Sequence, residues 1–490
     1  MVDLLLVRSN DQKSVYGDTS KFVACEPPFW IATIAAFARQ DKEISVAVLD
    51  AEALNLSPED AVAKIKEISP AVIGLLVTGT NLSASTWKMH GAGILASEIK
   101  KSFSAKIFMW GLHPSALPDQ TLKEEDIDFV IRGENFDSIV QLVKTLKAGD
   151  NNFADIPGLF YKTAEGKVQG NFAIKLQTDL DALPMAAWDM LPMEKYHAHN
   201  WHRMGERKDK PNGYGIIATS LGCPFNCSFC AISALFDQKR VRYKSAKTVA
   251  DEIGLLVEKY NVYYIKIIDE CFVLNRKHVH AICDELIKRN YDVNIWAYAR
   301  VDTVDPETLD KLAKANIKWL CYGIESVSDR SLKDVKKGQY NLQKIKDSLR
   351  MTHEAGINVL ANYMFGLPED DMESMKDTLA FARETNCEWI NLYATMAYPG
   401  SKLYFDCIKN NVPLPESWLG YSQYSYECMP LPTKYLSGKE VLQFRDYAFN
   451  AFFEDNDAYF NLIRDKFSAQ DAENIKNMTK TKLRRKILGD

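Results

Sequence analysis

The chain has 490 residues, of which 47% are hydrophobic and 26% are charged. This balance is typical of a globular protein that buries large cores without disulfide bonds. The net charge of −5 at pH 7 excludes a general attraction to nucleic acid or to anionic membranes, so neither partner is expected.

Targeting and membrane signals are missing from the sequence. No stretch reaches the roughly 18 uninterrupted apolar residues that a transmembrane helix needs, and the first twelve residues do not form a signal peptide. The ten cysteines are scattered over the chain apart from one close trio. Scattered thiols are typical of an intracellular enzyme rather than a secreted disulfide framework, so we expect a cytoplasmic protein.

The first region, residues 1–150, alternates between strand-like and helix-like patterns. Apolar runs predict strands at residues 3–7, 45–49, 71–77, 106–110 and 129–131. Helical spacing follows at residues 29–39, 58–67 and 138–146, and Ser57 is suited to cap the second of these helices. The alternation predicts a doubly wound α/β sheet, in which ligands bind beyond the carboxyl ends of the strands. The loops at residues 78–83 and 111–114 are therefore expected to face a pocket.

A second alternation occupies residues 211–400. It is preceded by a proline-punctuated stretch, residues 151–210, which predicts a hairpin and an irregular linker. Strands are predicted at residues 215–220, 263–269, 293–299, 319–325, 358–365 and 389–394, with helices between them. Six strand–helix units predict a partial (β/α)6 barrel, whose chemistry lies at the carboxyl ends of its strands. Residues 401–490 predict a helical C-terminal segment, with the basic run at 476–486 on its solvated face.

Three cysteines, Cys223, Cys227 and Cys230, follow the first strand of this barrel with the spacing CxxxCxxC. Thiolates suit zinc or iron–sulfur clusters. A structural zinc needs a fourth ligand, and no Cys or His follows closely after Cys230. Three thiolates can instead hold three irons of a 4Fe–4S cluster and leave the fourth iron open to a bidentate ligand. A zinc loop completed by a distant ligand and three unrelated thiols are the alternatives.

The cysteine spacing, with the aromatic Phe229 before the last cysteine, resembles the radical S-adenosylmethionine (SAM) superfamily. The resemblance implies a 4Fe–4S cluster on the three cysteines, SAM on the open iron, and Phe229 against the adenine. It also implies SAM contacts from residues at the ends of the following strands, namely Asp269, Glu270, Arg300, Glu325 and Ser326. The alternatives are solvated carboxylates and, for Arg300, a salt bridge to a neighbouring carboxylate.

The first region and the linker resemble the cobalamin-binding domain of the cobalamin-dependent radical SAM enzymes. The motifs that carry this are WGLHP at 110–114, FVIRGE at 129–134 and DLDALPMAAWDMLP at 179–192. The implied architecture is an α/β protein with an N-terminal Rossmann-like cobalamin-binding domain, a radical SAM barrel and a helical C-terminal segment. The implied corrin contacts come from the loops at the edge of the first sheet: Gly79, Thr80, Asn81, Ser83, Trp110, Gly111, His113, Gly133 and Glu134.

Two features of this domain depart from the simplest pattern. The DxHxxG motif, whose histidine coordinates cobalt in many cobalamin proteins, is absent, because the sequence after Asp50 reads AEALNL. The lower face of the cobalt is then left to water or to the 78–83 loop, with Asn81 and Leu82 as candidates. For His113, a hydrogen bond to the loop backbone and direct cobalt binding are alternatives to a corrin contact. A Rossmann module that binds nothing is the alternative for the whole domain.

The resemblance implies a methyltransferase that uses a 5′-deoxyadenosyl radical and methylcobalamin to methylate an unactivated carbon of a small molecule. It also implies an electron donor such as flavodoxin or ferredoxin. The alternatives are a cobalamin-binding enzyme that performs a rearrangement or cyclisation, a cobalamin-free radical SAM enzyme, and a non-catalytic metal-binding scaffold. An RNA-modifying enzyme of the methylthio-transferring type is disfavoured, because the chain lacks an N-terminal cysteine trio and a basic RNA-binding domain.

Overall fold

The N-terminal sheet has seven strands in the order β2-β1-β3-β4-β5-β6-β7, in a computed structural model that describes residues 2–79, 81–206, 212–236, 239–338 and 340–490. Its parallel strands are β1 (Val2–Arg8), β2 (Val46–Asp50), β3 (Pro70–Val77), β4 (Lys106–Gly111) and β5 (Phe129–Ile131). Successive side chains of a strand point to opposite faces, so Leu4 and Leu6 join one core while Leu5 and Val7 join another. Burial on both faces explains why these strands are continuous apolar runs.

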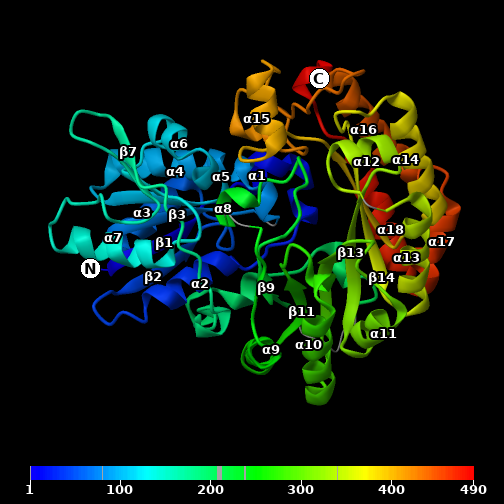
Figure 1. Cartoon of the computed structure of the whole chain (residues 1–490), viewed down its shortest axis with the longest axis horizontal. Coiled ribbons are helices and arrows are strands. Elements are labelled where there is room, and N and C mark those ends of the chain that lie inside the picture. Colours follow the sequence, from blue (N-terminus) through cyan, green and yellow to red (C-terminus); the bar gives the residue numbers. More distant parts are fainter. Residues whose placement is uncertain (1, 80, 207–211, 237–238, 339) are drawn as a thin grey trace.

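Helices cover both faces of this sheet (Figure 1). Residues of α2 (Phe29–Ala38) and α7 (Phe136–Lys147) pack in one core, and those of α3 (Pro58–Ile68) and α4 (Met89–Ser102) in the other. The short helices are α1 (Gln12–Tyr16), α5 (Leu112–Ala116) and α6 (Pro118–Glu124). The Ser57 hydroxyl accepts a hydrogen bond from Asp60 N (3.1 Å), which confirms the predicted cap. The sequence did not predict α4, whose Gly91 and Gly93 weaken its helical signal.

The predicted hairpin is present, but it belongs to the first sheet. Strand β6 (Leu159–Lys162) pairs antiparallel with β5, and β7 (Val168–Gly170) pairs antiparallel with β6. The sheet therefore runs to Gly170, past the expected boundary at residue 150.

Six parallel strands in sequential order form the partial barrel, as predicted. They are β8 (Gly213–Ile217), β11 (Val262–Ile267), β12 (Asn294–Ala299), β13 (Ile317–Glu325), β14 (Asn358–Phe365) and β15 (Trp389–Ala394). Helices α9 (Ala246–Tyr260), α10 (Arg276–Arg289), α11 (Pro306–Lys314), α13 (Leu342–Glu354) and α14 (Met372–Thr385) cover its outer face (Figure 1). The shorter elements of this region are α8 (Ser233–Phe236), α12 (Asp329–Asp334), and the paired strands β9 (Ser220–Leu221) and β10 (Arg242–Tyr243).

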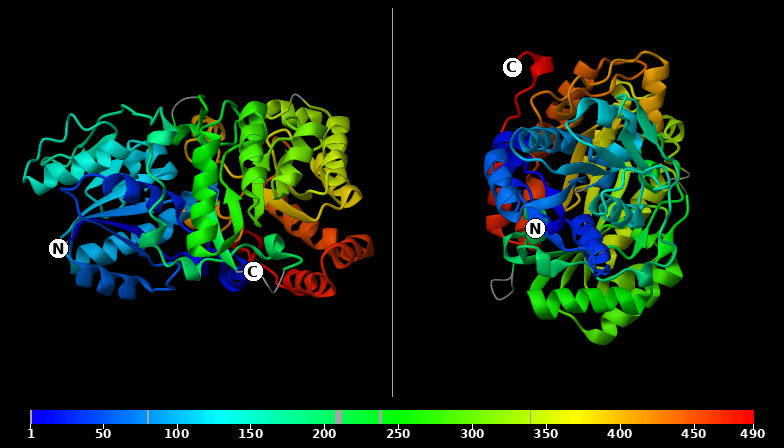
Figure 2. Two further views of the ribbon diagram at one scale, coloured as in Figure 1. Left: turned by 90° about the horizontal axis from the view of Figure 1, so that it is seen from below. Right: turned by 90° about the vertical axis from the view of Figure 1, so that its left-hand side faces the viewer.

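The C-terminal segment adds α15 (Lys402–Lys409), α16 (Gly438–Phe453), α17 (Asp457–Lys466) and α18 (Ala469–Thr479). Figure 2 shows α17 and α18, in red, at the barrel end of the molecule, opposite the N-terminal sheet. The basic run beyond α18 is not simply a solvated face, because Arg485 is only 1% exposed. Its guanidinium donates to the Asp446 carboxylate (2.8 and 2.9 Å) and to the carbonyl of Gln423 (2.6 Å). No helix within the described residues is long and apolar enough to cross a membrane.

Glu125, which follows α6, links the first domain to the C-terminal segment. Trp418 Nε1 donates to its carboxylate at 3.4 Å, and burial raises the pKa of Glu125 from 4.5 to about 7. Such a carboxyl group stabilises the folded chain while it is protonated. The contribution is present below pH 4.5, the ordinary pKa, and is lost as the pH rises through about 7.

We therefore expect Glu125→Gln, which stays neutral, to raise the free energy of unfolding at pH 8 by about 1–2 kcal/mol. At pH 5 the change should be close to zero. Thermal unfolding of the variant and the wild-type protein at both pH values checks this. A difference that does not change with pH would contradict it.

Candidate active site

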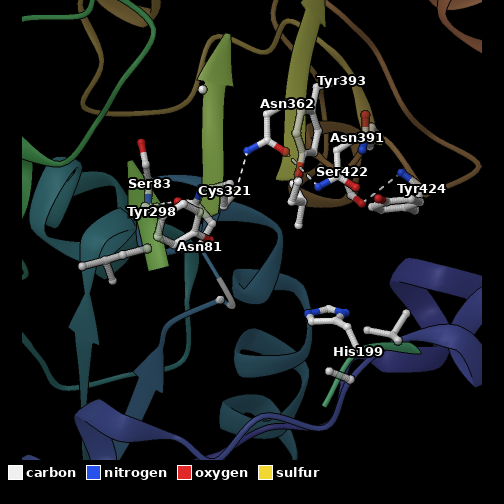
Figure 3. Close-up of a pocket in the computed structure, with 18 of the residues that line it drawn as sticks. Asn81, Ser83, His199, Tyr298, Cys321, Asn362, Asn391, Tyr393, Ser422 and Tyr424 are labelled. Carbon is white, nitrogen blue, oxygen red and sulfur yellow. Dashed lines mark hydrogen bonds between the residues drawn. The ribbon is translucent and has the colours of Figure 1, made fainter. Parts of the chain in front are cut away.

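A cavity of about 770 Å³ is lined by residues of the N-terminal domain, the barrel and the C-terminal segment. From the first domain it receives the loop after β3, with Gly79, Asn81, Leu82 and Ser83. Figure 3 shows part of this wall, including Asn81 and Ser83 from the first domain and His199 from the linker. The loop at residues 78–83 therefore faces a pocket, as predicted.

The barrel contributes alternate residues of β11, β13 and β14 to the cavity. Side chains alternate along a strand, so one set faces the cavity while residues such as Tyr322 and Tyr363 are fully buried on the helix side. From β11 to β14 the lining includes Lys266, Ile268, Trp296, Tyr298, Arg300, Cys321, Gly323, Glu325, Leu360, Asn362 and Met364, and from β15 it includes every residue from Trp389 to Ala394. These side chains set the chemistry available to a ligand.

Cys223, Cys227 and Cys230 lie in the loop between β9 and α8, half-buried on the wall of the cavity together with Phe229. Burial raises the pKa of the Cys223 and Cys230 thiols to about 12, so metal binding has to release their protons. Three free thiols on one loop at a cavity fit the donor set of a 4Fe–4S cluster. Within the described ranges no three His, Cys, Asp or Glu side chains are grouped as ligands of one metal ion. The thiolates of a cube each bind a different iron, so they need no common point.

Ser83 connects the two domains at this loop. Its hydroxyl donates to Cys230 Sγ at 3.4 Å and accepts from the backbone N–H of Ala231 at 3.0 Å. We expected Ser83 to contact a corrin, whereas its observed contacts are with the cysteine loop. The loop after β3, which the resemblance assigns to the corrin, is therefore hydrogen-bonded directly to the cysteine loop, which it assigns to the cluster.

Ser83→Ala should lower the reduction potential of the bound cluster. A hydrogen bond to a ligand sulfur favours the more negative, reduced form of the cluster. Its loss should shift the potential downward by tens of millivolts, on the order of 1 kcal/mol. A redox titration followed by electron paramagnetic resonance measures the shift, and Ser83→Thr, which keeps the hydroxyl, is the control. An unchanged potential in Ser83→Ala would show that the contact does not act on the cluster.

The predicted SAM contacts Glu270, Arg300 and Glu325 all line the cavity. Burial, followed by the neighbouring Asp269 carboxylate, raises the pKa of Glu270 to about 7. Glu325 adopts a left-handed backbone conformation with φ of 67°, and its carboxylate pairs with Lys337 Nζ at 2.9 Å. Sequence reasoning missed Lys337, because it lies beyond α12 rather than at a strand end.

Arg300 forms a salt bridge to a neighbouring carboxylate, which the sequence analysis gave as the alternative to a SAM contact. It donates to the Asp302 carboxylate at 2.9 and 2.8 Å and to the carbonyl of Lys337 at 3.1 Å. Its guanidinium carbon lies 3.9 Å from the centre of the Phe225 ring. Arg300 is thus held in place at the cavity wall by contacts within the protein.

Asp269 and Ser326 do not line the cavity. The Asp269 carboxylate accepts from Thr219 N (2.7 Å), Thr219 Oγ1 (2.5 Å) and Ser220 Oγ (2.6 Å). It therefore fixes the chain just before the cysteine loop. Ser326 accepts from Ser328 N at 3.1 Å and lies 3.3 Å from Thr378 Oγ1. Of the two acidic residues at the end of β11, Glu270 is the one that reaches the cavity.

Five of the expected corrin contacts do not line the cavity and have contacts within the fold: Trp110, Gly111, His113, Gly133 and Glu134. Trp110 Nε1 donates to the carbonyl of Gly133 at 2.8 Å, and Glu134 pairs with Arg242 at 2.7 Å. His113 is fully buried, with Nδ1 3.4 Å from Thr86 Oγ1. Thr80 lies outside the described residues. Of the described members of the set, Gly79, Asn81 and Ser83 line the cavity.

Gly111 has a role within the fold that does not depend on a ligand. Its φ is 144°, and a Cβ at this position would lie 2.2 Å from the carbonyl oxygen of Val77. The close approach of β3 therefore requires glycine at this position whether or not a ligand is bound.

Glu26 and Lys266 form a buried ion pair that the sequence did not reveal. Lys266 Nζ donates to the Glu26 carboxylate at 2.9 Å, across 240 residues of sequence. Burial alone would raise the pKa of Glu26, but Lys266 and His199 lower it to about 2. The pair joins the N-terminal domain to the inner wall of the barrel.

Comparison with known proteins agrees with this arrangement. The family model described as the radical SAM superfamily matches residues 217–382, and the B12 binding domain model matches residues 17–143. An uncharacterized methyltransferase of Pyrococcus horikoshii is 30% identical over 81% of this chain and 82% of its own length. The anaerobic magnesium-protoporphyrin IX monomethyl ester cyclase of Rubrivivax gelatinosus is 28% identical over 77% of this chain and 66% of its own.

Among solved structures, the radical SAM methyltransferase TsrM from Kitasatospora setae, with cobalamin and a [4Fe-4S] cluster bound, has the same fold. Its TM-score is 0.69 at 17% identity, over 98% of this chain and 99% of that one. The cysteine loop, the sheet that precedes it, the shared cavity and the relative from Pyrococcus lead to one conclusion. The chain belongs to the cobalamin-dependent radical SAM enzymes.

Proposed function

We propose that this protein is a methyltransferase that transfers a methyl group to an unactivated carbon of a small molecule. The observation that carries the proposal is the shared cavity, onto which both the loop after β3 and the three cysteines open. The Ser83–Cys230 contact brings these two segments within hydrogen-bonding distance. The methyltransferase name of the Pyrococcus relative supports the same reaction.

The residues present fit three cofactors. Cys223, Cys227 and Cys230 would hold the cluster, and the loop containing Asn81 and Leu82 would lie against cobalamin. When bound, the cluster and SAM supply a carbon radical and methylcobalamin supplies the methyl group.

Charged residues at the ends of β11 to β13 would orient SAM. The carboxylates of Glu270 and Glu325 can accept hydrogen bonds from its ammonium group, while Lys337 can pair with its carboxylate. Lys337 and Glu325 are already 2.9 Å apart, so both ends of an amino acid group would find a partner at one place. Trp296, Tyr298 and Tyr393 line the cavity beyond them, and their rings would keep water from a reactive substrate.

The reaction also needs an electron donor and a reducing environment. All ten cysteines are free, as expected for a protein of the reducing cytoplasm. A flavodoxin or ferredoxin would supply the electron.

A cyclisation is the second candidate function, because the Rubrivivax relative is a cyclase of 28% identity. Both reactions would begin with removal of a hydrogen atom from the substrate. They differ in the product, since only methylation adds a carbon.

Anaerobic reconstitution tests the proposal. The protein is purified with iron, sulfide and cobalamin, reduced, and given SAM labelled with a deuterated methyl group together with a cell extract. We expect about four irons and about one cobalt per chain, release of 5′-deoxyadenosine, and a small molecule that carries the label. An unlabelled, cyclised product would favour the second candidate. Release of 5′-deoxyadenosine without stoichiometric cobalt would refute the role of cobalamin.

A further inference from the structure

A row of hydrogen-bonded side chains crosses the wall of the cavity on β13, β14 and β15 (Figure 3). Asn362 and Asn391 are partners in the parallel register of β14 and β15. Asn391 Nδ2 donates to Asn362 Oδ1 at 2.9 Å, and Asn362 Nδ2 donates to Cys321 Sγ at 3.1 Å. At the other end of the row, Trp389 Nε1 donates to Asn391 Oδ1 at 3.3 Å.

The indole at one end fixes the direction of both amides. An indole N–H can only donate, so the atom that it meets on Asn391 has to be the oxygen. The Asn391 nitrogen then faces Asn362, and the Asn362 nitrogen faces Cys321. An amide nitrogen carries two hydrogens and an amide oxygen accepts two hydrogen bonds. Each asparagine therefore has one further donor and one further acceptor available to a ligand.

Two lysines of the surrounding wall are paired with carboxylates within the protein. Lys266 pairs with Glu26 at 2.9 Å, and Lys337 pairs with Glu325 at 2.9 Å. Arg445 on α16 is 2.8 Å from Asp446. Arg485 also contacts Asp446 at 2.8 Å, so this carboxylate serves two guanidinium groups. At the Cys321 end of the row, near Lys266 and Lys337, an anionic group would therefore lose its hydration without gaining an unpaired positive charge.

The other neighbours of the row are aromatic. Tyr298 on β12 and Tyr393 on β15 line the same cavity, as does Tyr424 from the loop before α16. Figure 3 shows the Tyr393 and Tyr424 rings near Asn391. Their faces suit a flat or apolar part of a substrate, whose polar end would lie on the amides.

We propose that Asn362 and Asn391 bind an uncharged carboxamide or peptide group, which makes the substrate of this enzyme an amide with an aromatic or apolar flank. An amide group both donates and accepts, so it matches the paired donor and acceptor that each asparagine presents. A carboxylate only accepts, and it would meet the asparagine oxygens without a hydrogen to offer them. This inference rests on the proposed function, because it takes the cavity to be the site of the substrate.

Equilibrium dialysis of the full chain, loaded with cluster and cobalamin, tests the inference. The probes are two matched pairs: indole-3-acetamide with indole-3-acetate, and 3-phenylpropanamide with 3-phenylpropanoate. Members of a pair share their ring and carbon chain and differ only in the carboxamide or carboxylate group, which Asn362 and Asn391 would contact. We expect each amide to be retained at least about 10-fold more tightly than its acid.

Two variants test whether the preference for amides depends on Asn362 and Asn391. Asn391→Asp keeps the size of the side chain and an acceptor for Trp389, while Asn362→Leu removes the amide at the next strand. Each should weaken retention of the amides by about 10-fold. Asn410→Asp makes the same chemical change on the exposed end of α15 and should leave retention as it is. Iron content, cobalt content and the midpoint of thermal unfolding show whether each variant is folded.

The inference is overturned if the acids are retained as tightly as the amides, if neither is retained, or if both row variants behave like the wild type. Adding SAM with a deuterated methyl group to the same samples keeps the two proposals apart. Retention of amides without any labelled compound would contradict methyl transfer and leave the amide site standing. Label that appears only on an acid would contradict the amide site and leave methyl transfer standing.

Discussion

Cys227→Ala is expected to abolish the release of 5′-deoxyadenosine from SAM. Loss of one of three thiolates leaves a second iron of the 4Fe–4S cluster, besides the open one, without a protein ligand. Loss of a group that only hydrogen-bonds to a metal ligand already lowers metal affinity roughly 10- to 100-fold. Loss of the ligand itself should lower the affinity further. Iron content, the paramagnetic signal of the reduced cluster and the yield of 5′-deoxyadenosine together measure the effect.

Cys283→Ala is the matched control, because Cys283 is buried in α10 and does not line the cavity. It should keep its iron and its activity. Four irons per chain and wild-type cleavage of SAM in Cys227→Ala would mean that another set of ligands holds the cluster.

Arg242→Ala is expected to cost about 3–5 kcal/mol in the free energy of unfolding. Arg242 on β10 and Glu134 after β5 form a pair whose side chains are 2% and 1% exposed. Their two contacts measure 3.0 and 2.7 Å, and Arg242 also donates to the carbonyl of Gln177 at 2.6 Å. The variant leaves the Glu134 carboxylate buried without its counter-charge, which is why the cost is large.

Chemical unfolding measures this loss of stability. Two further variants test whether it comes from the unpaired buried charge. Glu134→Leu combined with Arg242→Met removes both charges and should recover part of the loss. Arg350→Ala breaks an exposed pair with Glu354, in which the side chains are 59% and 60% exposed, and should cost less than about 0.5 kcal/mol. Equal losses for Arg242→Ala and Arg350→Ala would show that burial of the pair contributes nothing.

The sequence predicts the helices and strands of this fold better than the contacts between residues that are far apart in the chain. Strands such as β3 and β14 are recognisable because their apolar runs and alternation are local properties. The three cysteines are recognisable because their spacing is local as well. Glu26 and Lys266 meet across 240 residues of sequence, and no short window holds information about that contact.

The expected corrin contacts of the WGLHP and FVIRGE motifs stay predictions for a related reason. A motif such as WGLHP marks positions that are constrained, but it does not say by what. In Gly111 the constraint is the backbone of the neighbouring strand, and in Trp110 it is a carbonyl within the same domain. Asn362 and Asn391 lie on strands that the sequence predicts, but they became a pair only with the register of those strands.

The position of Arg485 determines when the cavity is complete. Residues from the segment 481–490 lie on its wall, and Arg485 joins that segment to α16 through Asp446. During synthesis, the N-terminal domain and the barrel emerge long before this segment is available to dock. An open, half-walled stage therefore precedes the closed one. At that stage the part of the wall formed by residues 481–490 is absent, so docking of Arg485 on Asp446 completes the cavity.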